Sequence, residues 1–162
     1  MTEFQGRRIT HEYTQINFAP PETVFPLLCP VREAEWVPGW RYRLIYSKSG
    51  VAELGCVFMT EENGRRITWV VTEYDPAAFR IGFVWVDAGR VTAEIRIELE
   101  AGEVPLQTAA HIRYTYTGLS VEGNGEVKRF DEDWFRQKMQ GWEAAINHYL
   151  TTGGLIDGAR SE

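Results

Sequence analysis

The chain has 162 residues, of which 44% are hydrophobic and 25% charged, values that suit a single globular domain with its own core. Its net charge is −6 and its Lys and Arg residues form no run, so we expect neither nucleic acid nor an anionic membrane surface as a partner. No 18 consecutive residues are apolar and the first residues form no apolar leader, which predicts no membrane insertion and a cytoplasmic location.

The first part of the chain predicts one strand followed by two short helices. Residues 8–18 alternate loosely and are rich in Thr, Tyr and Ile, as in a β-strand. Pro21 suits the first turn of a helix, and Pro30 both ends that helix and can open a second one over residues 31–36. Pro38-Gly39 then predicts a turn, because glycine readily takes a positive φ.

The middle of the chain predicts about six antiparallel strands in series. Asn63-Gly64 is a strong hairpin signal, because both residues tolerate the positive φ of a tight turn. From Val91 to Glu100, apolar residues alternate with Thr, Glu and Arg, which indicates a strand with one buried and one solvated face. The predicted strands span residues 40–46, 54–60, 65–74, 79–85, 91–100 and 107–117.

The last predicted element is a long amphipathic helix that begins near Asp131. Acidic residues at its start complement the positive end of the helix dipole. Phe135, Met139, Trp142 and Ile146 recur at helical spacing and form one apolar stripe. A helix with such a stripe can cover the buried face of the predicted sheet.

The order of these elements, together with four sequence stretches, resembles the SRPBCC superfamily, which includes START domains, birch-pollen-allergen-like proteins and aromatic polyketide cyclases. The stretches are INFAPPETVFPLL at residues 16–28, EWVPGW at 35–40, WVVTEYDP at 69–76 and FRQKMQGWEAAINHYL at 135–150. The resemblance implies an α+β helix-grip fold, in which a curved antiparallel sheet of about seven strands wraps around a long C-terminal helix and two short helices follow the first strand. It also implies a deep cavity between the sheet and the long helix.

The resemblance covers nearly the whole chain and sets the expected domain organisation. Residues 1–152 are predicted to form a single helix-grip ligand-binding domain, as a monomer or homodimer. Residues 153–162 begin with Gly153-Gly154, are mostly small and polar, and are predicted to form a flexible C-terminal tail. The stretch VEGNGE at residues 121–126 is expected to be a flexible connection that can gate the cavity.

Large side chains on the predicted inner faces either fill a plain core or line the cavity that the resemblance implies. Rings with a polar tip suit a pocket for a flat, mostly apolar ligand. Pro38 prevents one continuous helix through the two tryptophans that flank it, so one of them can cap the cavity mouth and the other can begin its wall; the alternative is two corner residues without ligand contact. The predicted ligand-binding residues are Trp36 (the cap), Trp40 (the wall), Tyr42, Trp69, Phe83, Trp85, Tyr114, Tyr116, Met139 and Trp142.

Few titratable residues are candidates for catalysis. Glu73 lies at strand spacing from two apolar residues and can point inward, where burial would raise its pKa. His11 lies on the first strand with an ambiguous face. Neither the histidines nor Cys29 and Cys56 have a metal-ligand spacing, so no metal and no cofactor is predicted; the two cysteines are expected to be reduced and buried, although the sequence leaves a disulfide open.

Three functions are compatible with this sequence. The favoured one is binding of a small, largely hydrophobic molecule, lipid-, polyketide- or aromatic-like, in the internal cavity. The alternative is an enzyme of the polyketide cyclase or dehydratase kind that uses the same cavity, for which a buried acid–base pair is expected. The second alternative is a protein-interaction domain similar to the chaperone-activator members of the superfamily, for which an exposed apolar patch is expected.

Overall fold

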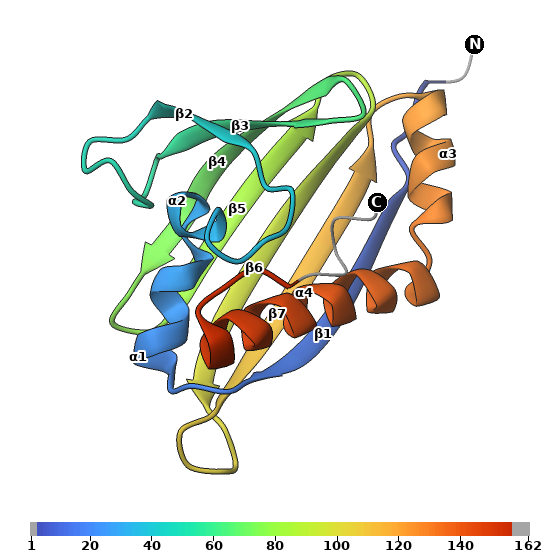
Figure 1. Ribbon diagram of the computed structural model, residues 1–162. Helices are drawn as coiled ribbons and strands as arrows, with labels where there is room; N and C mark the ends of the chain where they lie inside the picture. The colour runs from blue at the N-terminus through green and yellow to red at the C-terminus, as the bar shows by residue number, and fades with distance from the viewer. Residues whose placement is uncertain (1–2, 157–162) are drawn as a thin grey trace.

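Seven antiparallel strands form one sheet, in the order β1-β7-β6-β5-β4-β3-β2, in the computed structural model, which describes residues 3–156 (Figure 1). Six of them follow one another as neighbours, and only β1 crosses over to pair with the last strand. The strands are β1 (Arg8–Asn17), β2 (Tyr42–Tyr46), β3 (Val57–Glu62), β4 (Arg65–Asp75), β5 (Arg80–Asp87), β6 (Val91–Ala101) and β7 (Thr108–Gly118).

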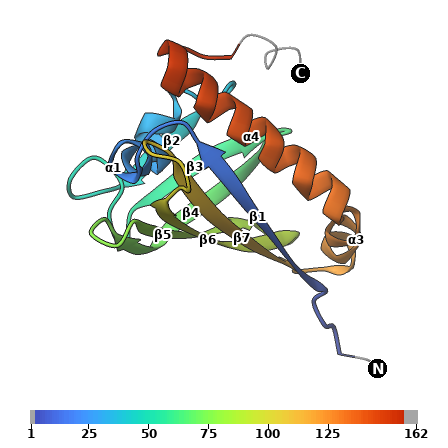
Figure 2. The same ribbon diagram turned by 90° about the horizontal axis from the view of Figure 1, so that it is seen from below.

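One long helix, α4 (Glu132–Thr152), crosses a single face of the curved sheet (Figures 1 and 2). Three short helical segments follow β1, namely α1 (Pro21–Val24), the 3-10 turn η1 (Phe25–Leu28) and α2 (Pro30–Glu33), and they lie beside the C-terminal end of α4. A further helix, α3 (Val121–Arg129), lies beside its N-terminal end. The α+β helix-grip architecture predicted from the sequence is confirmed.

The alternation of β6 separates the buried face of the sheet from its solvated face. Val91, Ala93, Ile95, Ile97 and Leu99 are all buried, whereas the Glu and Arg residues between them are exposed. Burying apolar surface stabilises a fold by about 25 cal/mol per Å², so this face must be covered. The apolar stripe of α4 provides the cover, with its phenylalanine, methionine and isoleucine fully buried as predicted.

Hydrogen bonds between α4 and the edge strand β1 fix the position of the long helix. Glu143 accepts from the Tyr13 hydroxyl (2.6 Å) and from the Ile16 backbone N–H (2.7 Å). One turn later, Asn147 accepts from the Phe18 N–H (3.0 Å) and donates to the Ile16 carbonyl (2.8 Å). Burial, together with the Glu143 carboxylate, raises the pKa of Tyr13 to about 12. These contacts satisfy part of the β1 edge, which no further strand covers.

The expected flexible connection at residues 121–126 is instead the first part of α3, and that prediction is wrong. Ser120 caps the helix by accepting a hydrogen bond from the Gly123 N–H (3.0 Å). Gly123 lies against the backbone of Arg90, where an added Cβ would come within 1.7 Å of the carbonyl oxygen. Gly123 therefore permits close docking of the helix. The sequence did not predict this helix because glycine has a low intrinsic helix propensity.

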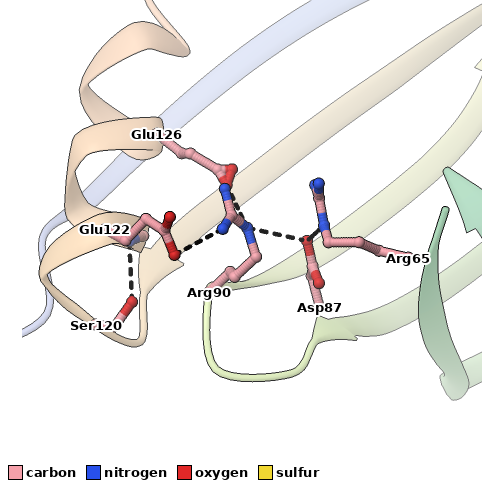
Figure 3. Close-up of polar contacts among 7 residues, drawn as sticks. Arg65, Asp87, Arg90, Ser120, Glu122 and Glu126 are labelled. Atoms are coloured by element: carbon pink, nitrogen blue, oxygen red, sulfur yellow. Dashed lines mark hydrogen bonds and ion pairs between the residues drawn. The ribbon is translucent and has the colours of Figure 1, made fainter. Parts of the chain in front are cut away.

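An ion-pair network holds α3 against the β5–β6 turn (Figure 3). Arg90 donates from Nε (2.9 Å) and Nη2 (2.6 Å) to Glu126 Oε1, and its Nη1 lies 2.7 Å from Glu122 Oε1. The buried Asp87 accepts from Arg65 Nε at 2.9 Å and lies 3.8 Å from Arg90 Nε. Both buried carboxylates of the network are thus paired, as buried charges must be.

The remaining predictions concern membrane-spanning helices, the two cysteines and the end of α4. No helix within residues 3–156 is long and apolar enough to cross a membrane. Cys29 and Cys56 are buried and free, as predicted. Gly153 ends α4 with a φ of 78°, and most of the predicted flexible tail lies outside the described residues.

Candidate functional site

A cavity of about 280 Å³ lies between the sheet and α4. Its walls come from β3 to β7, from α4, and from the segment that joins α2 to β2. Six of the ten predicted ligand-binding residues line it. They are Trp40, Trp69, Phe83, Tyr114, Met139 and Trp142.

The aromatic wall of the cavity is held in place by ring packing and by hydrogen bonds to the protein. Trp69 packs edge-on against Phe83 (centroids 6.0 Å apart) and against Trp40 (6.1 Å). The Trp69 indole donates to Thr60 Oγ1 and the Trp40 indole to the Pro30 carbonyl, each at 2.9 Å. Because these rings are fixed and all three line the cavity, they present preformed apolar surface to it.

Trp36 does not line the cavity, and the interpretation of it as a cap is wrong. Its side chain is 0% exposed, and its indole donates to the Leu27 carbonyl at 2.9 Å. Its ring packs behind Trp142, with centroids 5.0 Å apart. Trp36 is therefore a corner residue of the core, whereas Trp40 does form part of the wall.

Three further predicted ligand contacts also lie outside the cavity lining. Tyr42, on the edge strand β2, pairs across the sheet with Thr60 and packs against the core. Trp85 packs on Tyr116 at 6.2 Å, and Tyr116 in turn packs on Phe130 at 4.9 Å where α3 meets α4. For these residues the plain core interpretation holds.

Glu33 is a cavity residue that sequence reasoning missed. It lies at the end of α2 and is 9% exposed, yet none of the hydrogen bonds or ion pairs within residues 3–156 involves its carboxyl group. Burial raises the pKa of Glu33 well above its ordinary value. The available signal was its spacing of three and four residues before Trp36 and Val37, which places it on the buried side of that turn.

Tyr114 is the second polar group within the cavity. It lies on β7, and burial raises its pKa. Its hydroxyl therefore stays protonated at neutral pH and can donate a hydrogen bond. Glu33 and Tyr114 are thus two buried polar side chains in a cavity that is otherwise lined by apolar and aromatic residues inside its charged rim.

Four exposed charged residues mark the cavity opening: Arg41, Glu61, Glu62 and Lys138. Surrounding protein lowers the pKa of Lys138, although its side chain is exposed, and the nearby Glu62 opposes that shift. None of the four forms an ion pair with Glu33. The cavity thus combines a charged rim with aromatic surface inside it.

Neither of the predicted catalytic candidates reaches the cavity. The ring of His11 lies outside the cavity lining. Its Nε2 donates to the Phe130 carbonyl (2.6 Å), and the ring stacks on Phe135 with centroids 5.0 Å apart. Glu73 pairs with Gly82 after a register shift in β4, which turns its side chain to the outer face near Arg80. Glu73 therefore does not point inward, a possibility that its strand spacing left open only for an unbroken ladder.

No group of three or more His, Cys, Asp or Glu side chains within residues 3–156 is arranged to hold a metal ion. The polar groups of the cavity are instead a carboxyl, a phenol and the charged rim. This donor set suits hydrogen bonding to an organic ligand.

Comparison with known proteins places this fold among solved structures. No protein-family model matches the sequence, and no curated protein matches it. Norcoclaurine synthase from Thalictrum flavum is similar in structure, with a TM-score of 0.67 and 11% identity over 94% of this chain and 98% of that one. Ara h 8.0201 gives a TM-score of 0.63 and 16% identity over 90% and 99% of the two chains.

A third similar structure is the di-domain ARO/CYC protein BexL of the BE-7585A biosynthetic pathway, with a TM-score of 0.65 and 18% identity over 90% of this chain and 46% of BexL. The chain therefore has the same helix-grip fold as these structures, as its sequence stretches predicted. At these identities the likeness concerns the fold alone.

Proposed function

We propose that this protein binds a small, largely hydrophobic, aromatic-like molecule in the cavity between the sheet and α4. The observation that carries this proposal is the preformed aromatic wall of Trp40, Trp69 and Phe83, which faces open space rather than packed side chains. Protein interiors are otherwise close-packed, so a cavity of this size lined by fixed rings favours a ligand over filler. The fold of the similar structures agrees with this proposal.

An enzyme of the cyclase or dehydratase kind is the second candidate, because the cavity holds titratable groups. Burial perturbs the pKa of Glu33 and that of Tyr114, and perturbed groups in a cavity are candidates for acid–base work. His11 and Glu73, which the sequence suggested for this role, lie elsewhere. A catalytic role would therefore fall to Glu33 and Tyr114.

Native mass spectrometry of gently purified protein tests the binding proposal. We expect one small molecule per chain, released on denaturation, and a lower occupancy in a Trp142→Ala variant that removes part of the wall. If the purified protein carries no ligand, binding of 2-ethylnaphthalene measured by equilibrium dialysis tests the same proposal. Protein that carries no ligand and also fails to bind this hydrocarbon contradicts the proposal.

A further inference from the structure

Glu33 differs from the other buried acidic side chains of residues 3–156. Asp87 and Glu126 are also buried, but each is paired with arginine, Asp87 with Arg65 at 2.9 Å and Glu126 with Arg90 at 2.6 Å. Glu33 has no such partner. Because an unpaired buried charge is very costly, the Glu33 carboxyl is held in its neutral, protonated form.

Backbone hydrogen bonds fix the main chain of Glu33 at the cavity wall. The Glu33 N–H donates to the Cys29 carbonyl (2.9 Å), and the Glu33 carbonyl accepts from Trp36 (3.2 Å) and Val37 (2.8 Å). The neighbouring Arg32 is committed to Glu35, with its Nε 2.8 Å from the carboxylate. The chain thus places a buried carboxyl in the cavity, and within residues 3–156 it forms no ion pair that would favour the ionised form.

The other titratable and charged groups facing the cavity are Tyr114 across from Glu33 and the rim residues Arg41, Glu61, Glu62 and Lys138. Tyr114 is protonated and offers a second O–H. Of the three tryptophans that line the cavity, Trp40 and Trp69 donate their indole N–H to the protein, whereas that of Trp142 has no partner within residues 3–156. The Glu33 carboxyl, the Tyr114 hydroxyl and the Trp142 indole thus each offer the cavity a hydrogen-bond donor.

We propose that Glu33 is a specificity-determining hydrogen-bond donor, which selects aromatic ligands carrying an acceptor oxygen such as a ketone or aldehyde carbonyl. This inference rests on the proposed binding function and names the ligand class for that cavity. In the free protein, water can satisfy Glu33, since the cavity is polar at this point and large enough to hold it. A ligand that displaces this water gains affinity only when it restores the hydrogen bond.

A cationic ligand fits these groups less well than an acceptor oxygen. It would require Glu33 to ionise and both charges to leave water, and the desolvation cost of such a buried pair often exceeds its Coulombic gain. A carbonyl oxygen accepts from the neutral carboxyl without creating any charge. The geometry therefore favours acceptor ligands over amines.

Three probes with a common naphthalene ring separate these possibilities: 2-ethylnaphthalene, 2-acetylnaphthalene and 1-(2-naphthyl)ethylamine. Dissociation constants are measured by equilibrium dialysis for the wild type and for two variants. Glu33→Gln keeps N–H donors but cannot ionise, and Glu33→Leu removes every polar atom. For each protein we take the ratio of the ethyl to the acetyl dissociation constant. Comparing this ratio between the wild type and a variant cancels the intrinsic difference in hydrophobicity between the two probes.

We expect this ratio to fall roughly tenfold from the wild type to Glu33→Leu, because a buried hydrogen bond is lost and the ligand oxygen is left unpaired. In Glu33→Gln the ratio should stay within about threefold of the wild-type value. In the wild type it should also fall as pH rises through the pKa of Glu33, whereas it should be flat in Glu33→Gln. The rim groups and Tyr114 are present in both proteins, so their titration does not produce this difference. Thermal unfolding of each variant checks that it is folded.

The possible outcomes distinguish this inference from the proposed function. An equal ratio in the wild type and Glu33→Leu, with the hydrocarbon still bound, overturns the role of Glu33 and leaves the binding function standing. Tightest binding of the amine, lost in both variants, overturns the inference in favour of a carboxylate counter-ion. Failure of all three probes to bind any of the proteins contradicts the proposed function and the inference together.

Discussion

The rings of Trp36 and Trp142 pack against each other with centroids 5.0 Å apart, and only Trp142 reaches the cavity. Trp36 supports the wall from behind, anchored by its hydrogen bond to the Leu27 carbonyl. The turn at Pro38-Gly39 separates this buried residue from Trp40, which lines the cavity directly. The two tryptophans around one turn thus have different roles, one in the core and one in the wall.

Trp36→Ala tests the supporting role of that residue. Removing a fully buried tryptophan leaves a large void, so we expect a loss of about 3–5 kcal/mol in the free energy of unfolding. Urea denaturation followed by circular dichroism measures it. A stability within about 0.5 kcal/mol of the wild type, the range of ordinary surface substitutions, would show that Trp36 is not a core residue.

Trp142 and Trp134 provide a matched pair on α4 for testing the cavity wall. Trp142 lines the cavity, whereas Trp134 is 36% exposed and stacks on Phe130 at 4.4 Å. We expect Trp142→Leu to weaken binding of 2-ethylnaphthalene about tenfold, since roughly 1–3 kcal/mol of apolar contact is lost, and Trp134→Leu to leave it nearly unchanged. Equilibrium dialysis gives both constants. Equal effects of the two substitutions would argue against the cavity as the binding site.

The sequence predicted the sheet and the long helix well because their patterns are regular. The alternation from Val91 to Leu99 determines which face of β6 is buried, and neighbouring strands must follow the same sidedness. The register shift in β4 has no such pattern, and it reverses the orientation of Glu73. Irregularities of this kind depend on contacts between strands rather than on local propensity.

The candidate site was only partly predictable for a related reason. Periodicity identifies inward-facing rings such as Trp69 and Trp85, but it does not show which of them meet other side chains and which face open space. Glu33 was missed because a charged residue in a short helical turn is usually solvated. Its burial follows from tertiary packing around the turn that leads to Trp40.

Gly123 and Gly125 provide a matched pair for testing whether α3 is docked on the β5–β6 turn. An added Cβ at Gly123 would lie 1.7 Å from the Arg90 carbonyl oxygen, whereas at Gly125 it would meet nothing within 4 Å. We therefore expect Gly123→Ala to destabilise the protein by about 1–3 kcal/mol through overpacking, and Gly125→Ala to stabilise it by about 0.5–1 kcal/mol through helix propensity. Thermal unfolding of both variants measures this. Stabilisation by both substitutions would indicate that α3 is not docked on the β5–β6 turn.

The raised pKa of Glu33 predicts a specific pH dependence of stability. A carboxyl whose pKa is higher in the folded than in the unfolded state contributes most stability below its ordinary value of 4.5, and that contribution is lost as pH rises through the folded pKa. The free energy of unfolding of the wild type should therefore fall relative to that of Glu33→Gln as pH rises from about 4.5. Urea titrations of both proteins across this range provide the difference. A constant difference would mean that Glu33 is ionised and hydrated in the folded protein.

The most direct test of ligand binding in the cavity is to follow the indole N–H signals of the six tryptophans by NMR while 2-acetylnaphthalene is added. Three of these side chains, Trp40, Trp69 and Trp142, line the cavity, and Trp134, which does not line it, serves as a control on α4. We predict saturable shifts of the three cavity signals with little change at Trp134. Shifts confined to Trp134, or no saturable shift at all, would contradict ligand binding in the cavity.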